Sequence, residues 1–190
     1  MSGHWFFGYG SLVNRATHGY GRAFRAQVGG WRRAWRHRAA RRVPFLTAVR
    51  CPDSRIEGLV AQVPGGDWQA LDRREAGYRR GCAGPDLQPF ADGAGVARAQ
   101  IYAVPESDWT GPEGLPPIRL SYLDVVLQGY LREFGRDGVL RFIATTDGWD
   151  IPIMDDRAAP RYPRHQPLDR AERAWFDSVL AAQGVTILRG

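Results

Sequence analysis

The order of strand-like and helix-like stretches along the 190-residue chain is the feature that most limits its fold. Strand-like runs of β-branched and aromatic residues fill the first half, at residues 4–9, 26–38, 46–50, 56–63 and 97–104. Helical patterns interrupt these runs once and then take over, at residues 68–75, 121–134, 137–143 and 168–182. Because the two patterns do not alternate regularly, the order predicts an α+β fold on an antiparallel or mixed sheet, whose five or six short strands can close into a small barrel.

Local signals predict where some of these elements end. Pro-Asp-Ser at residues 52–54 favours a turn between the two neighbouring strands. Ser121 and Asp124 have the spacing of a capping box at the start of a helix that Gly135 should stop. Residues 148–167 contain four prolines and are expected to form an ordered surface loop.

The length of the chain fits a single domain, which we expect to span residues 1–190. No internal repeat and no linker-like stretch divides it. The first residues lack the basic and apolar regions of a signal peptide, and no apolar run is long enough to span a membrane. We therefore expect a cytoplasmic protein without a membrane partner, while its oligomeric state stays open.

The chain carries a net charge of +6, and all 26 of its basic residues are arginine. This excess favours an anionic partner, either a carboxylate substrate or a nucleic acid. Residues 30–42 combine arginines with Trp31 and Trp35, a composition that also suits RNA binding. In a strand, however, Trp31, Arg33, Trp35 and His37 share one face, so tryptophans packed inward with arginines extending outward explain the pattern as well. No RNA-binding motif accompanies it, and we expect no nucleic-acid partner.

The histidines and cysteines predict neither a metal site nor a disulfide framework. His4, His18, His37 and His165 lack the spacing of metal ligands, and Cys51 and Cys82 form no CxxC pair. We expect no metal and no other cofactor.

Gly8-Tyr9-Gly10-Ser11-Leu12 directly follows the first predicted strand. Val13 stands where a dinucleotide-binding loop has its third glycine, and Tyr9 and Val13 replace the flanking glycines of a nucleophile elbow around Ser11. Two interpretations remain. The segment is an ordinary strand-to-loop turn, or its backbone N–H groups bind a carboxylate or an oxyanion.

Glu75 lies at the end of the helix that Asp67 is placed to cap and Gly77 to end. It could be a solvated glutamate paired with Arg79. Its spacing from Trp68 and Leu71, however, puts the carboxylate on the apolar face of the helix. A carboxylate that is partly buried near a helix C-terminus is expected to have a raised pKa, which suits an acid-base residue.

Several motifs together resemble the γ-glutamylcyclotransferase superfamily, including its ChaC-like and AIG2-like branches. They are Phe7-Gly8-Tyr9-Gly10-Ser11-Leu12, Val28-Gly29-Gly30-Trp31-Arg32-Arg33, Ile56-Glu57-Gly58-Leu59-Val60, Leu71-Asp72-Arg73-Arg74-Glu75-Ala76-Gly77-Tyr78 and Ser121-Tyr122-Leu123-Asp124-Val125-Val126-Leu127-Gln128-Gly129. Their order and spacing carry the resemblance, which extends to about residue 150. It implies a small β-barrel flanked by helices with a cavity at one side of the barrel.

The resemblance also implies an activity and a site. The substrate is a γ-glutamyl peptide or amide, such as glutathione, which cyclises to 5-oxoproline and releases an amine or an amino acid. Such a lyase or acyltransferase works by intramolecular aminolysis. Glu75 would be the catalytic residue, and the substrate-binding residues would be Gly8, Tyr9, Gly10, Ser11, Leu12, Tyr78 and Tyr122.

One departure concerns the choice of substrate. In ChaC-like proteins that act on glutathione, one residue usually separates the glutamate from a Gly-Gly-Tyr, whereas Glu75-Ala76-Gly77-Tyr78 is one residue shorter. The leaving group therefore stays open between glutathione, a γ-glutamyl dipeptide and a γ-glutamylamine. The alternatives to an enzyme are a non-catalytic module of the same fold that binds γ-glutamyl compounds and, less favoured, an RNA-binding protein.

Overall fold

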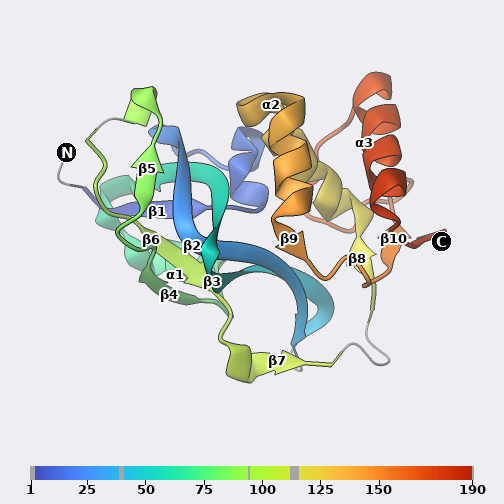
Figure 1. Ribbon diagram of the computed structural model, residues 1–190, viewed down its shortest axis with the longest axis horizontal. Coiled ribbons are helices and arrows are strands. Elements are labelled where there is room, and N and C mark those ends of the chain that lie inside the picture. The colour runs from blue at the N-terminus through green and yellow to red at the C-terminus, as the bar shows by residue number, and fades with distance from the viewer. Residues whose placement is uncertain (1–2, 39–40, 94, 112–115, 190) are drawn as a thin grey trace.

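The computed structural model describes residues 3–38, 41–93, 95–111 and 116–189 (Figure 1). The strands in these ranges are β1 Trp5–Gly8, β2 Ala23–Arg38, β3 Arg41–Gln62, β4 Arg79–Cys82, β5 Leu87–Pro89, β6 Gln100–Ala103, β7 Trp109–Thr110, β8 Ile118–Arg119, β9 Thr146–Asp147, β10 Ile153–Asp155 and β11 Ile187–Arg189. The α-helices are α1 Trp68–Arg74, α2 Leu120–Ala144 and α3 Arg170–Gln183. Short 3₁₀ turns are η1 Ser11–Val13, η2 Arg15–Thr17, η3 Pro64–Gly66, η4 Ala91–Gly93 and η5 Glu106–Asp108.

The larger sheet has the strand order β4-β6-β1-β3-β2-β5, with β7 and β9 also pairing with β2. It is mixed, because β1 pairs with β3 antiparallel and with β6 parallel. A smaller sheet has the order β11-β10-β8, and α2 and α3 lie side by side next to it (Figure 1). The predicted α+β fold with a mixed sheet and flanking helices is thus confirmed. The path of described strands is open, ending at β4 and β5, so the sheet curls without closing into a true barrel.

Strands β2 and β3 form one long antiparallel ribbon, and the turn predicted at residues 52–54 is wrong. β3 continues through this segment, while the register shifts from Gly29 opposite Arg55 to Trp31 opposite Arg50. Extra residues of β3 therefore form a bulge opposite Gly30, which has a φ of 81°. A bulge accommodates Pro52 because it leaves a backbone N–H unneeded in the ladder.

The face predicted for residues 31–37 is buried. Trp31, Arg33, Trp35 and His37 are all nearly inaccessible, while Arg32 on the other face is partly exposed. The two tryptophans that an RNA-binding surface would use for base stacking are therefore packed in the core. Arg33 belongs to the same predicted face as the tryptophans and is buried with them, at 1% exposure.

Helix α2 begins without the predicted capping box. Arg119 is its N-cap residue, and the Ser121 backbone N–H and hydroxyl instead donate to Asp156, each at 2.7 Å. Asp124 is paired with Arg157, so it cannot serve as the box carboxylate. Gly135 does interrupt the helix, with φ 69° and ψ −170°, and a second helical stretch follows as predicted.

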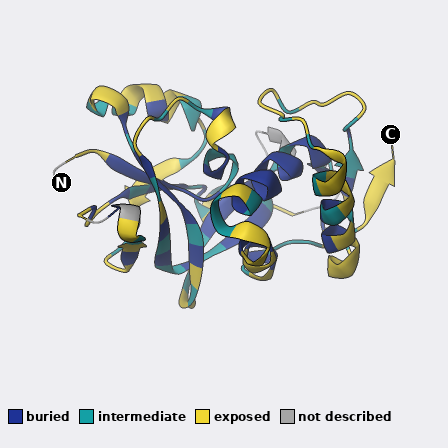
Figure 2. Cartoon of the chain, turned by 90° about the horizontal axis from the view of Figure 1, so that it is seen from above, coloured by how far each residue is buried: buried dark blue, intermediate teal, exposed yellow. Residues whose placement is uncertain are grey.

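The segment 148–167 is more than a surface loop, because it contains β10 and the buried Ile153. Helix α3 starts at the capping box of Asp169 and Glu172 and buries Phe176 and Leu180. The rest of this helix, near the C-terminus, is largely exposed (Figure 2). Trp175 of the same helix is only half-buried. In the described part of the chain, no helix combines the length and apolar character needed to cross a membrane.

Candidate functional site

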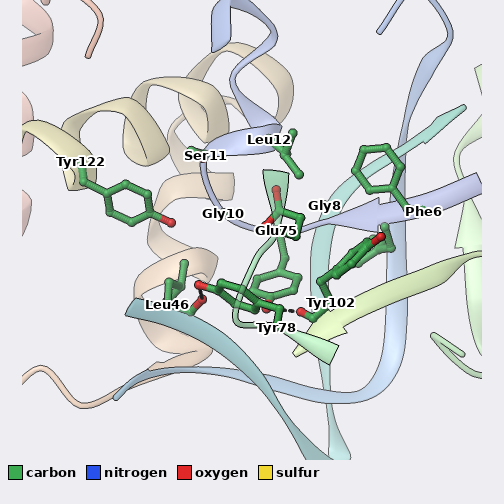
Figure 3. Close-up of a pocket in the computed structure, with 12 residues that line it drawn as sticks. Phe6, Gly8, Gly10, Ser11, Leu12, Leu46, Glu75, Tyr78, Tyr102 and Tyr122 are labelled. Carbon is green, nitrogen blue, oxygen red and sulfur yellow. Dashed lines mark hydrogen bonds between the residues drawn. The ribbon is translucent and has the colours of Figure 1, made fainter. Parts of the chain in front are cut away.

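A pocket of about 50 Å³ opens where β1 runs into η1 (Figure 3). Its lining residues are Phe6, Phe7, Gly8, Tyr9, Gly10, Ser11, Leu12, Leu46, Glu75, Tyr78, Tyr102 and Tyr122. The structure thus brings together every residue that the sequence suggested for the site, although Glu75 and Tyr122 are far from the loop in sequence.

Glycines give the Gly8–Leu12 loop its shape by allowing close contacts. A Cβ atom on Gly8 would lie 2.7 Å from the Leu12 Cβ, and one on Gly10 would lie 2.9 Å from the Tyr122 hydroxyl oxygen. The loop then turns through hydrogen bonds from Val13 N–H to the Gly10 carbonyl (2.9 Å) and from Asn14 N–H to the Ser11 carbonyl (3.1 Å). Gly10 therefore allows the phenol of Tyr122, which comes from α2, to approach the loop backbone (Figure 3).

The Tyr9 side chain is fixed by hydrogen bonds to two strands. Its hydroxyl donates to the Tyr102 carbonyl at 2.5 Å and accepts from the Ala48 N–H at 3.0 Å. Burial raises the pKa of this phenol, so it stays protonated. The side chain thus joins the loop to β3 and β6, a structural role that the resemblance did not imply.

Arg33 is hydrogen-bonded to the backbone of the same loop. The acceptors of its guanidinium are uncharged oxygens: the carbonyls of Tyr9 (3.3 Å) and Glu57 (2.5 Å) and the hydroxyls of Thr145 (2.7 Å) and Tyr130 (2.6 Å). The Tyr130 hydroxyl also donates to the Tyr9 carbonyl, at 2.9 Å. The alternation puts Arg33 on the face of the buried tryptophans, but its role in positioning the site was not predicted, because its acceptors Tyr9 and Glu57 are distant in sequence.

Glu75 is the C-cap residue of α1. Its N–H donates to the Leu71 carbonyl at 2.9 Å, and the chain reverses nearby at Gly77, which has a φ of 100°. The Glu75 side chain is 19% exposed, consistent with the face predicted from Trp68 and Leu71. Its carboxylate lies 3.3 Å from the Arg74 guanidinium and forms an ion pair with it.

Three tyrosines surround the rest of the pocket. Tyr78 donates to the Leu46 carbonyl at 3.0 Å, and Tyr102 donates to Asp72 at 2.5 Å. Burial raises the pKa of Tyr122, and the nearby Glu75 carboxylate adds to the shift. Burial likewise raises the pKa of Tyr102. Tyr102 and Tyr122 are therefore protonated at neutral pH. The single O–H of Tyr102 already donates to Asp72, whereas the Tyr122 hydroxyl is the donor offered to an anionic ligand.

Four lining residues were not predicted from the sequence: Phe6, Phe7, Leu46 and Tyr102. Phe6 and Phe7 immediately precede the loop, and their place on the same strand is a signal that could have included them. Leu46 and Tyr102 reach the pocket through sheet pairing, which the sequence does not specify. Among the described residues, no group of three or more His, Cys, Asp or Glu side chains could hold a metal ion.

Comparison with known proteins gives one family and several structural neighbours. The family described as ChaC-like protein matches residues 4–113, more than half of the chain. No curated protein matches it by sequence.

The structural neighbours share the fold at low sequence identity. A human protein described as uncharacterized protein loc79017 has a TM-score of 0.57 at 11% identity, over 92% of this chain and 98% of its own. YkqA from Bacillus subtilis has a TM-score of 0.57 at 15% identity, over 78% of this chain and 57% of its own. A protein named gamma-glutamyl cyclotransferase has a TM-score of 0.55 at 11% identity, over 92% and 98% of the two chains.

Proposed function

Because the chain belongs to the ChaC-like protein family, we propose that it is a γ-glutamylcyclotransferase, with Glu75 as its acid-base residue. The observation that carries the proposal is the convergence of the Glu75 carboxylate, the Gly8–Leu12 loop and Tyr122 on one pocket. The name of one structural neighbour, gamma-glutamyl cyclotransferase, supports the same activity.

The reaction needs one proton carrier. The α-ammonium group of the substrate gives a proton to the Glu75 carboxylate, and the free amine attacks the γ-carbonyl carbon of the same molecule. Glu75 gives this proton to the leaving nitrogen, and the bond from the carbon to that nitrogen breaks. The attacking nitrogen loses a second proton to the Glu75 carboxylate as the lactam forms, and the released amine finally takes up this proton. The products are 5-oxoproline and an amine or amino acid, and one carboxylate serves as base and then as acid.

Holding the substrate bent provides much of the catalysis. The attacking and reacting groups belong to one molecule, so fixing them at contact distance removes an entropic cost that can reach about 7–11 kcal/mol. The aromatic and glycine residues that line the pocket would hold the γ-glutamyl group in this bent shape. No metal, nucleotide or other cofactor takes part in this reaction.

Loop and phenol groups are placed to stabilise negative charge. A hydrogen bond links the Ser11 backbone to the Tyr122 hydroxyl, beside Gly10. We propose that Gly8, Tyr9, Gly10, Ser11 and Leu12 bind the substrate α-carboxylate or the oxyanion that forms on the γ-carbonyl, together with the Tyr122 hydroxyl. Tyr78, whose hydroxyl donates to the Leu46 carbonyl, would contact the substrate through its ring.

The test is 5-oxoproline release from a panel of γ-glutamyl compounds, glutathione included, followed by mass spectrometry. Glu75→Gln keeps the shape of the side chain but cannot carry the proton, so kcat should fall about 10²- to 10⁴-fold. The circular dichroism spectrum should stay unchanged. Glu106→Gln makes the same chemical change at an exposed residue outside the pocket and should leave kcat unaltered.

Near-wild-type turnover by Glu75→Gln would disprove the acid-base assignment. If the wild-type protein binds γ-glutamyl compounds but turns none over, the protein is the non-catalytic binding module instead. An RNA-binding assay at low and high salt checks the remaining alternative, and we expect no salt-dependent binding.

A further inference from the structure

A second cavity, of about 180 Å³, adjoins the proposed active site. The two share Leu46, Tyr78 and Tyr122 as common walls. The other lining residues of the second cavity are Trp35, Pro44, Phe45, Ile118, Arg119 and Tyr162. If the γ-glutamyl group occupies the first cavity, the leaving group attached to its γ-carbon lies next to these shared residues and can extend into the second cavity.

The walls of the second cavity are mostly aromatic rings in edge-to-face contact. Tyr122 contacts Tyr162 and Trp35 with ring centroids 5.0 and 5.8 Å apart, and Phe45 contacts Tyr78 at 6.0 Å. Aromatic walls of this kind favour a further ring in edge-to-face or offset geometry. A cavity of roughly 150 Å³ is large enough for benzene, so the volume here suffices for one aromatic side chain.

Arg119 is the charged residue in this lining. Its guanidinium donates to the Arg161 carbonyl at 3.0 Å, and no carboxylate in the described ranges forms an ion pair with it. A guanidinium at the edge of an apolar cavity is suited to bind a carboxylate in a bidentate manner. The combination fits a ligand with a ring and a carboxylate.

Tyr162 is held in place by specific hydrogen bonds. Its N–H donates to the Ser121 hydroxyl at 3.2 Å, and the Arg161 N–H donates to Asp156 at 3.0 Å. Because Asp156 also binds Ser121 at the start of α2, the segment carrying Tyr162 is fixed against the helix that carries Tyr122. Arg119 and Tyr162 both lie beyond residues 4–113, so the family match does not account for this wall.

We propose that the leaving group is an aromatic α-amino acid, so that the preferred substrates are γ-glutamyl-phenylalanine and its aromatic analogues. The inference depends on the proposed cyclotransferase function. The ring of the leaving amino acid packs between Phe45 and Tyr162, and its carboxylate binds Arg119. This arrangement keeps the scissile amide at the shared wall, next to Tyr122.

The experiment compares kcat/KM for γ-glutamyl-phenylalanine, γ-glutamyl-alanine, γ-glutamyl-phenethylamine and glutathione. Burial of the ring should favour the phenylalanine compound about tenfold or more over the alanine compound and glutathione. The phenethylamine compound, which lacks the carboxylate, should be at least about tenfold worse than the phenylalanine compound.

Two variants assign these preferences to residues. Tyr162→Ala should reduce the phenylalanine-over-alanine ratio to near one, and Arg119→Gln should remove the preference for phenylalanine over phenethylamine. Arg164→Gln changes an exposed arginine of the same segment outside the cavity and should alter neither ratio.

Calorimetry measures how tightly the same compounds bind to the Glu75→Gln variant. Together with the turnover data, it distinguishes failure of the aromatic leaving group from failure of the cyclotransferase function. Turnover of γ-glutamyl-alanine at least as fast as that of γ-glutamyl-phenylalanine overturns the aromatic leaving group and leaves the cyclotransferase intact. If no compound is turned over, the cyclotransferase fails. In that case, the binding constants still test the second cavity. Tighter binding of γ-glutamyl-phenylalanine than of γ-glutamyl-alanine supports it as a site for an aromatic ring, and equal or weaker binding rejects it.

Discussion

Arg33 is a buried cation whose hydrogen bonds go to carbonyl and hydroxyl oxygens. Its guanidinium also lies 4.9 Å from the ring centroids of Tyr130 and Phe142. Burial lowers the pKa of this guanidinium, which reflects the cost of taking the charge out of water. Hydrogen bonds and aromatic faces offset this cost, and in return Arg33 fixes the Tyr9 carbonyl behind the proposed substrate site.

Replacing Arg33 by methionine should destabilise the protein by about 3 kcal/mol, because the buried Tyr9 and Glu57 carbonyls lose a donor. Urea unfolding measures the change. Arg32→Met is the matched control on the opposite face of β2. Its ion pair with Asp147 is partly exposed, so removing it should cost less than about 1 kcal/mol. Equal losses for the two variants would show that burial of Arg33 contributes nothing.

At the scale of single elements, helix α2 depends on a residue far along the chain. Asp156 accepts from the Ser121 N–H and hydroxyl and so acts as the missing cap. Burial by itself would raise the pKa of Asp156, but hydrogen bonds from Ser121 and Arg161 outweigh it and hold the pKa below its ordinary value. The start of α2, and with it Tyr122, is therefore stabilised by an ionised carboxylate.

Asp156→Ala should lower the free energy of unfolding at pH 7 by about 1–2 kcal/mol. A carboxyl with a lowered folded-state pKa stabilises the fold above its ordinary pKa of about 4, and this contribution disappears as the pH falls through the folded value. The difference between wild type and variant should therefore shrink below about pH 4. Asp150→Ala, at an exposed position, is the control, and a pH-independent difference would contradict the assignment.

These elements show which predictions the sequence could support. The strand-then-helix order and the alternation around Trp31 and Trp35 depend on local periodicity, and the structure confirms both. The predictions of the capping box and of the turn at residues 52–54 were wrong because both segments contact partners distant in sequence. Ser121 donates to Asp156, and residues 52–54 form a bulge within β3, which pairs with β2 on both sides of it. The site residues came from a resemblance, since spacing alone cannot bring Glu75 to the Gly8–Leu12 loop.

At the scale of the whole molecule, the C-terminal part is joined to the rest by charge as well as by strand pairing. Arg157 contacts Asp124 of α2 through two hydrogen bonds of 2.7 Å and Asp177 of α3 at 2.6 Å. Strand β9 pairs with β2 of the larger sheet. We infer that residues 1–190 fold as one domain, with Arg157 joining α2 to α3.

Arg157→Leu should destabilise the protein by about 3–5 kcal/mol, because it leaves the Asp124 carboxylate, only 5% exposed, without its partner. Replacing both residues by leucine should restore much of the loss, since no buried charge then remains unpaired. Arg132→Leu removes a longer pair of 3.9 Å with Glu172, its arginine half exposed, and should cost less than about 1 kcal/mol. A double variant as unstable as Arg157→Leu would contradict this explanation.

The open ends of the larger sheet bear on how the protein behaves at high concentration. A free strand edge offers unpaired N–H and C=O groups to other chains, and a sheet that does not close has two such edges. Here β4 is exposed along its length and carries Arg79 and Arg80, while β5 at the other end includes Pro89. The arginines of β4 repel the same strand of a second copy, and Pro89 of β5 offers no N–H donor. Both edges of the sheet are therefore protected against the edge-to-edge pairing that leads to aggregation.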